Sequence, residues 1–297
     1  TTTEYVILGS SKWTEITGHG LTEPVNSVAP ADDICYFAQG DDTALRRFRH
    51  YNNSGTFTAE WAADGTNKAV FLHVFRDQVN GYQIWRALNS DSNGHVSVSR
   101  GPQVAWGTNI TFESAIRVGA NNAQITNLID YDNLIFTFKE DGIYAIQNDL
   151  PDKLSADFGT QLSPINGSAA AIHSPYLFLS FMYSVERLYG RTLDDVGPVK
   201  GAGMPDGRQG PITSLMPIVK YIVASMDAGD SGTSSVMIYE NAWSELMRAP
   251  ESGERIRSLG YQVVPDKPHK IWVGCGGDLI SIPVSYTHLR AHETVLD

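Results

Sequence analysis

The stretch Leu134-Ile-Phe-Thr-Phe-Lys-Glu-Asp-Gly-Ile-Tyr-Ala-Ile146 decides the fold, because it contains two short apolar runs separated by a polar turn. Runs rich in aromatic and β-branched residues are typical of β-strands, and Asp-Gly is typical of a tight hairpin. A third apolar run, Ile125-Thr-Asn-Leu128, precedes the pair. The sequence therefore predicts three consecutive strands of an antiparallel sheet here.

Variants of this unit recur along the chain. Its first strand is echoed by Ile212-Thr-Ser-Leu215 and Ile256-Arg-Ser-Leu259. Its central strand is echoed by β-rich runs at 34–38, 69–75, 176–181, 220–225 and 270–274. Repeats of roughly 40–50 residues with four short strands are typical of β-propellers. We therefore predict an all-β fold, a β-propeller with about six visible blades of antiparallel four-stranded sheets, and leave open whether the ring is complete.

The central runs are almost entirely apolar, which indicates burial on both faces. A β-sandwich is the rival fold, but it does not predict the repeat. The long spacing between the runs at 69 and 134 predicts an insertion within Asn89–Ala123. The segment 241–248 fits either a helix or an outer strand, with Trp243 packing between blades.

The two ends of the chain have unusual sequences. The chain opens on Thr-Thr-Thr, and Val284–Asp297 resembles the translation of a sequencing adapter. We therefore predict a single propeller domain over 1–283, truncated at both ends, and a non-native tail over 284–297.

Composition excludes several classes of function. The chain has 297 residues, a net charge of −11 and 42% hydrophobic residues. An acidic protein does not attract nucleic-acid phosphates, and no apolar run reaches the ~18 residues of a membrane span. Cys35 and Cys275 fall in predicted central strands, so we expect buried free thiols, with a disulfide as the alternative.

No catalytic or cofactor motif is visible in the sequence. The histidines lack the close spacing of a metal pair, and no serine lies in a Gly-x-Ser-x-Gly elbow. Adjacent carboxylates such as Asp32-Asp33 and Asp41-Asp42 would point to opposite faces of a strand, so we do not predict shared sites. Asn89–Gly94 imitates half of a calcium loop, but its twelfth position is Arg100, which favours an exposed turn.

Acidic residues are enriched in the turns between the second and third strands of the predicted blades. Such turns gather on one face of a propeller, so we predict an acidic ligand-binding face. Its residues are Asp41, Asp42, Asp77, Glu140, Asp141, Asp227, Asp230 and Asp278. The alternative is that turns favour Asp for backbone reasons alone. We predict no cofactor and no metal, with a Ca²⁺ ion in the Asp227–Asp230 loop as a minor alternative.

Four segments carry a resemblance to a known group. They are DDICYFAQGDD (32–42), NLIFTFKEDGIYAI (133–146), VERLYGRTLDDVGPVKGAGMP (185–205) and KIWVGCGGDLISI (270–282). Together they resemble uncharacterised β-propeller-like repeat proteins of metagenomic and phage-related origin. The resemblance implies a propeller with a virion- or tail-associated binding role, and it assigns no catalytic residue.

We therefore expect a non-enzymatic structural or binding module that recognises protein or glycan through its loop face. Exposed Trp or Tyr side chains would anchor the ligand. One alternative is a carbohydrate-active propeller enzyme, a glycosidase or lyase, and another is an extracellular sensor domain. The resemblance implies a virion or extracellular location. The sequence leaves the oligomeric state open.

Overall fold

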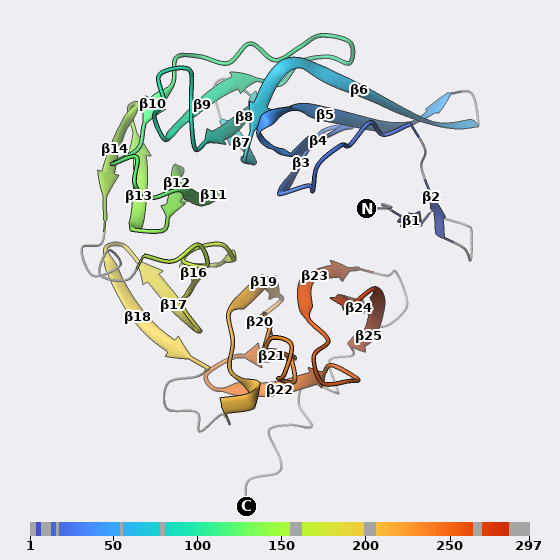
Figure 1. The fold of residues 1–297 in the computed structure, drawn as a ribbon, viewed down its shortest axis with the longest axis vertical. Coiled ribbons are helices and arrows are strands. Elements are labelled where there is room, and N and C mark those ends of the chain that lie inside the picture. The colour runs from blue at the N-terminus through green and yellow to red at the C-terminus, as the bar shows by residue number, and fades with distance from the viewer. Residues whose placement is uncertain are drawn as a thin grey trace, which may run out of the picture. The chain divides into compact units, whose positions relative to one another are not determined.

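The computed structural model describes residues 4–6, 13–15, 18–53, 56–77, 81–154, 162–198, 206–263 and 269–284. Their regular secondary structure consists of β-strands, apart from the three-residue 3-10 helix η2 (Asp206–Arg208) (Figure 1). The chain divides into two compact units. Unit 1 comprises residues 1–137 and 144–153, and unit 2 comprises residues 138–143 and 154–297.

Unit 1 contains a hairpin, two complete sheets and most of a third sheet. The hairpin pairs β1 (Glu4–Val6) with β2 (Trp13–Glu15). The first sheet has the order β3 (Ser27–Ala31), β4 (Ile34–Ala38), β5 (Gly40–Asn53) and β6 (Thr56–Ala69). The second has the order β10 (Ile116–Arg117), β9 (Ser97–Pro102), β8 (Gly81–Leu88) and β7 (Phe71–Asp77). The third has the order β11 (Ile125–Tyr131), β12 (Leu134–Lys139), β13 (Gly142–Gln147) and β14 (Leu150–Lys153), with residues 138–143 grouped in unit 2.

Unit 2 contains three further sheets. One has the order β15 (Ala170–His173), β16 (Tyr176–Phe181), β17 (Ser184–Tyr189) and β18 (Thr192–Gly197). The next has the order β19 (Ile212–Ile218), β20 (Tyr221–Met226), β21 (Ser235–Tyr239) and β22 (Trp243–Arg248). The last has three strands in the described part of the chain, β23 (Ile256–Gln262), β24 (His269–Cys275) and β25 (Asp278–Val284).

The prediction of an all-β chain built from antiparallel four-stranded repeats is confirmed. Five of the six predicted central runs lie in the second strand of a sheet, namely β4, β12, β16, β20 and β24. The run at 69–75 was wrongly predicted as central, because it lies mainly in β7, which is the first strand of its sheet. Burial explains why these runs are apolar without alternation. Every residue of β20 is buried, as are five of the six residues of β12, because both faces of an inner strand are covered.

Turns fix the register of the repeat that decided the fold. Asp132 and Asn133 join β11 to β12, and Asn148 and Asp149 join β13 to β14, all four with positive φ. Asp and Asn tolerate this left-handed conformation, which two-residue hairpin turns need. Both turns with a left-handed pair are therefore made by Asp and Asn residues. The sequence led us to expect this conformation in the turn Glu140-Asp-Gly142, but neither Glu140 nor Asp141 has a positive φ.

Each hydrophobic core lies between two consecutive sheets. In unit 1, Ile34 and Tyr36 of the first sheet pack in one cluster with Leu72 and Ile84 of the second. In unit 2, a cluster joins the sheets β15–β18 and β19–β22, and another joins β19–β22 and β23–β25. Face-to-face packing of successive small sheets gives each sheet the burial that it cannot obtain alone.

The segment 241–248 is not a helix, and its residues Trp243–Arg248 form the strand β22. Its first residue, Trp243, donates a hydrogen bond from Nε1 to the carbonyl oxygen of Val196, which lies in β18 of the neighbouring sheet, at 2.7 Å. The predicted packing of Trp243 between blades is therefore confirmed. A buried indole N–H needs such a partner, and here the bond also joins two sheets.

The prediction of an insertion within Asn89–Ala123 is partly wrong. The segment contains β9 and β10, which are the third and fourth strands of the second sheet, so it belongs largely to the repeat. The additional residues are 103–115, between β9 and β10, which we call the cover loop.

Cys35 and Cys275 are free thiols, as predicted, although Cys35 is only half-buried. Burial raises the pKa of both thiols, which keeps them protonated at neutral pH. Of the predicted non-native tail, Val284 ends β25, and residues 285–297 lie outside the described part of the chain. The predicted domain boundary at 283 stays a prediction.

A histidine–aspartate pair joins two sheets of unit 1. His73 Nε2 on β7 lies 2.7 Å from Asp130 Oδ1 on β11. This hydrogen bond lowers the pKa of Asp130 below its usual range, against the opposing effect of burial. A carboxylate with a lowered pKa in the folded state stabilises the fold above its unfolded pKa of about 3.9.

We expect Asp130→Asn to reduce stability at neutral pH by under about 1 kcal/mol, since the pair is partly exposed. The stabilisation by Asp130 is lost as pH falls through the lowered pKa, so wild type and variant should converge only at acidic pH below that pKa. Thermal unfolding of both proteins between neutral and acidic pH measures this difference. A gap that stayed constant with pH would contradict the assignment.

Candidate functional site

The cover loop lies over the first sheet and is held there by a buried ion pair. Arg47 on β5 and Asp64 on β6 have exposed side-chain fractions of 2% and 0%, and Arg47 Nη1 lies 3.5 Å from Asp64 Oδ1. Arg47 also donates to the carbonyl oxygen of Thr108 in the loop. Asp64 Oδ1 accepts the backbone N–H of Ile110 at 3.1 Å. Both charges of the pair therefore bind the loop backbone.

A second network holds the indole ring of Trp106, which lies in the cover loop. The Arg49 guanidinium lies 4.8 Å from the Trp106 ring centre and 4.3 Å from that of Tyr51. Glu60 fixes this stack, because Oε2 lies 2.7 Å from Arg49 Nη2 and Oε1 accepts the Tyr51 hydroxyl at 2.9 Å. Hydrogen bonds from Arg49 and Tyr51 lower the pKa of Glu60, so its carboxylate stays ionised.

These elements form an open hollow of about 630 Å³ in unit 1, which we call the aromatic groove. It is lined by Asp32, Asp33, Arg49, Tyr82, Pro102, Gln103, Val104, Ala105 and Trp106. Tyr82, at the start of β8, has 40% of its surface exposed. Gln103 Nε2 donates to the carbonyl oxygen of Ala31 at 3.2 Å, which joins the start of the cover loop to the β3–β4 turn.

The groove combines two aromatic rings with carboxylates, an amide and a guanidinium. Pockets of this volume are typical of small-molecule and cofactor sites, where a few polar groups orient a ligand against apolar walls. Because Arg49 and Glu60 position Trp106 before any ligand arrives, little side-chain entropy is lost on binding. The arrangement therefore suits a ligand that has both an apolar face and several hydrogen-bonding groups.

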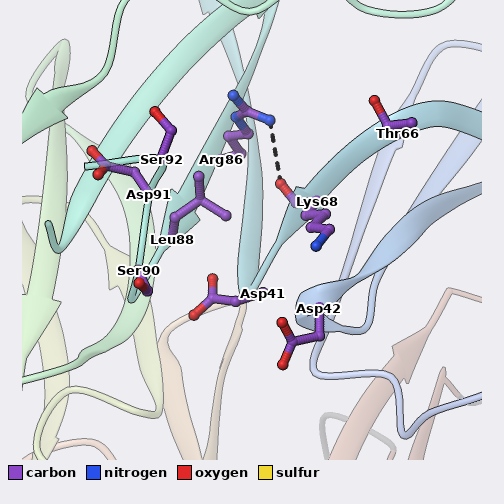
Figure 2. A pocket seen from close by; sticks show the side chains of 9 residues that line it. All are labelled: Asp41, Asp42, Thr66, Lys68, Arg86, Leu88, Ser90, Asp91 and Ser92. Atoms are coloured by element: carbon purple, nitrogen blue, oxygen red, sulfur yellow. Dashed lines mark hydrogen bonds between the residues drawn. The ribbon is translucent and has the colours of Figure 1, made fainter. Parts of the chain in front are cut away.

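A second hollow of about 330 Å³, the charged pocket, also lies in unit 1 (Figure 2). It is lined by Asp41, Asp42, Thr66, Lys68, Arg86, Leu88, Ser90, Asp91 and Ser92. The Asp41 carboxylate accepts the backbone N–H of Asn89 at 3.1 and 3.2 Å, which ties β5 to the turn after β8. Burial raises the pKa of Asp41 against the lowering effect of these bonds.

The residues of the predicted acidic face are divided between the two units. In unit 1, Asp41 and Asp42 line one pocket, whereas Asp77 ends β7 and its side chain lies outside the described part. In unit 2, Glu140 and Asp141 form the β12–β13 turn, Asp227 and Asp230 lie in the loop after β20, and Asp278 begins β25. The shared acidic face itself stays a prediction.

Sequence reasoning about adjacent carboxylates was wrong. Asp32 and Asp33 both line the aromatic groove, and Asp41 and Asp42 both line the charged pocket. Alternation holds only for regular strands. Asp32 lies in a turn with φ of 55°, and the register of β5 against β6 shifts after Gly40. Both local irregularities turn neighbouring side chains toward one side.

Arg255 contacts Asp227 and Asp230, the two aspartates of the loop in which the sequence analysis considered a Ca²⁺ ion. Its Nη2 lies 2.7 Å from Asp230 Oδ1, and its Nη1 lies 3.8 Å from Asp227 Oδ2. Among the described residues, no group of three or more His, Cys, Asp or Glu side chains is placed to hold a metal ion. The calcium alternative stays untested.

The loop at Asn89–Gly94 is an exposed turn, as favoured from the sequence. Asp91 Oδ1 accepts the backbone N–H groups of Asn93 and His95 at 2.8 and 3.0 Å. These bonds are typical of the Asx turns by which aspartate stabilises loops.

Sequence reasoning missed the residues of the aromatic groove. Trp106 and Arg49 are separated by more than 50 positions, and no spacing rule joins them. The extra length of Asn89–Ala123 could have indicated a functional site there, because long loops on a rigid scaffold often carry function.

No family model and no curated protein sequence matches this chain. Solved structures do match. Sqt1 from Chaetomium thermophilum has a TM-score of 0.59 at 10% identity, over 89% of this chain and 70% of that one. A luciferin-regenerating enzyme has a TM-score of 0.54 at 8% identity, over 85% of this chain and 84% of that one. Hsv2 from Kluyvelomyces marxianus has a TM-score of 0.53 at 8% identity, over 90% of this chain and 78% of that one.

At these identities the likeness shows the fold alone. The chain is a β-propeller whose six sheets are the blades, as the repeat predicted. Within the described residues, no helix is long and apolar enough to cross a membrane.

Proposed function

We propose that this β-propeller is a non-enzymatic binding module that recognises a glycan through the aromatic groove. The observation that carries the proposal is the pre-positioned Trp106 ring beside Tyr82 and the carboxylates of Asp32 and Asp33. A pyranose ring has an apolar C–H face, which packs on an aromatic ring, and a rim of hydroxyl groups. Carboxylates and amides offer several acceptors and donors for such a rim.

A glycan suits the groove better than a folded protein partner. Stable protein interfaces bury about 800 Å² on each side and need a broad complementary surface. The groove is instead a local hollow of about 630 Å³ with a few convergent polar groups. The virion- or tail-associated role that the resemblance implies is part of the proposal, since such a module would meet the glycans of a host surface.

The alternative is a carbohydrate-active enzyme. Most glycosidases place two carboxyl groups on either side of the scissile bond, roughly 5–9.5 Å apart. Among the described residues that line the groove, the carboxylates are Asp32 and Asp33, which are neighbours in one turn. Two carboxylates from a single wall favour holding hydroxyl groups over cleaving a bond.

Glycan-array screening of the intact chain, followed by calorimetric titration of the best oligosaccharide, tests the proposal. We expect Trp106→Ala to weaken binding about 30-fold, corresponding to about 2 kcal/mol for a central aromatic anchor. Tyr82→Ala should weaken glycan binding about tenfold. This change should affect folding stability less than Trp106→Ala, because Tyr82 is more exposed than Trp106.

Tyr183→Ala is the matched control, because Tyr183 is an exposed tyrosine of unit 2 with 48% of its surface accessible. It should bind glycan as wild type does. Unchanged binding by both groove variants, or no glycan retained on the array, would overturn the proposal. Release of new reducing ends from the bound oligosaccharide would replace it with the enzymatic alternative.

A further inference from the structure

The charged pocket contains two side chains whose charged groups form no hydrogen bond or ion pair with a described residue, although both act electrostatically on Asp41. They are Asp42 on β5 and Lys68 on β6. Figure 2 shows all three side chains around the pocket, with the Asp41 carboxylate turned toward Ser90 and the Lys68 ammonium on the side of Asp42. An anion and a cation that share a pocket without pairing are both available to a ligand.

The other charges of the pocket already have partners. Arg86 donates from Nε to Ser99 Oγ at 2.9 Å and from Nη1 to the carbonyl oxygen of Lys68 at 3.4 Å. Its guanidinium also lies 4.0 Å from the Phe112 ring centre. Asp41 accepts from the backbone of Asn89. Arg86 and Asp41 therefore shape the pocket, and Asp42 and Lys68 are left for recognition.

We propose that the charged pocket is a second site, distinct from the aromatic groove, and that it takes a small zwitterion such as a free α-amino acid. The ligand's ammonium group pairs with Asp42, beside Asp41, and its carboxylate pairs with Lys68. The hydroxyls of Ser90 and Ser92, on the turn after β8, line the same pocket as further hydrogen-bonding groups. Leu88 offers an apolar contact for a short side chain.

Charge selects for a ligand with both signs. The lining carries three carboxylates, Asp41, Asp42 and Asp91, and two cations, Lys68 and Arg86, so a ligand with both signs finds a partner for each of its charges. A volume of about 330 Å³ is at the lower end of the usual range for ligand pockets and suits a small molecule. Because the pocket is open and its free charges are partly hydrated, we expect millimolar affinity.

Two-dimensional amide NMR of the intact chain with L-alanine and its two singly charged fragments tests the inference. L-alanine carries both charges, ethylammonium lacks the carboxylate, and propionate lacks the ammonium group. We expect L-alanine to shift the resonances of residues 41–42, 68 and 90–92 at millimolar concentration, and each half-molecule to bind about tenfold more weakly. Equal binding of either half-molecule would overturn the inference, as would the lack of any shift at about 50 mM L-alanine.

Two conservative variants locate the site. Asp42→Asn and Lys68→Met should each weaken L-alanine binding about tenfold, since each removes one charge of the recognition pair. Asp132→Asn, which neutralises an exposed aspartate of the β11–β12 turn outside both pockets, should leave binding unchanged. Trp106→Ala should also retain it, so failure of the glycan proposal would not affect this result. Wild-type affinity in Asp42→Asn would overturn the assignment.

Discussion

Replacing Asp64 by Asn is expected to lower the free energy of unfolding by about 3–5 kcal/mol, because it leaves the Arg47 guanidinium buried and uncompensated. Both side chains are almost fully buried. The Asp64 carboxylate also accepts the Asn67 side-chain amide at 2.8 Å and the Ile110 backbone N–H at 3.1 Å. Desolvation makes such a pair a weak source of net stability, but it makes the loss of one partner costly.

Arg47→Met should be destabilising to a similar degree, because it leaves the carboxylate alone while it keeps an apolar stem. Combining Arg47→Met with Asp64→Asn should cost less than the sum of the two changes, since neither buried charge then remains. Urea unfolding followed by tryptophan fluorescence, in a double-mutant cycle, measures this coupling.

The matched control is a surface pair of the same residue types. Arg187 Nη2 lies 3.1 Å from Asp194 Oδ2, and both side chains are substantially exposed. Asp194→Asn should therefore change stability by under about 1 kcal/mol. If Asp64→Asn had an equally small effect, the ion pair would not be what holds the cover loop in place. The affinity of the aromatic groove for the proposed glycan should also fall in Asp64→Asn, because the same loop carries Trp106.

Gly210→Ala is expected to destabilise unit 2 by about 3 kcal/mol, the upper end of the usual cost of overpacking. A Cβ at Gly210 would lie 1.8 Å from the carbonyl oxygen of Asp227, which is backbone and cannot rotate away. The two segments cannot simply separate, because the Asp227 N–H donates to the carbonyl oxygen of Pro211 at 3.0 Å. The substitution therefore strains the loop that carries Asp227 and Asp230.

Gly207→Ala provides the control within the same segment. A Cβ at Gly207 meets nothing within 4 Å, so the change should be within about 0.5 kcal/mol of neutral. Thermal unfolding of both variants and of wild type measures the difference. Equal stability of the two alanine variants would show that the close approach of Gly210 to Asp227 does not constrain this part of the fold.

Local sequence predicted the blades well, because each blade is made of neighbouring strands. Buried runs such as Leu134–Lys139 and Tyr221–Met226 are apolar on both faces, so a few residues are enough to predict that they are inner strands. The hairpin partners follow within ten or so positions, which leaves little choice of topology. Even Trp243 was predictable as an inter-blade residue once its segment was considered as an outer strand.

The candidate sites were not predictable in the same way. Pairing of Arg47 with Asp64 depends on the register of two long strands, and contact with Thr108 and Ile110 depends on where the cover loop falls. Alternation rules failed for Asp32-Asp33 and Asp41-Asp42, because a positive φ and a register shift are tertiary choices that a strand pattern does not reveal.

The sequence by itself therefore determined the repeating unit, the antiparallel order of its strands and the β-propeller class. These properties follow from hydrophobic runs and turns within each repeat. Only the tertiary structure decided that residues 103–115 cover the first sheet, that Trp106 meets Arg49, and that Asp42 and Lys68 share a pocket. The first two contacts join residues from different repeats, and their geometry depends on how whole sheets pack. The third lies within one sheet and depends on the shifted register of β5 against β6.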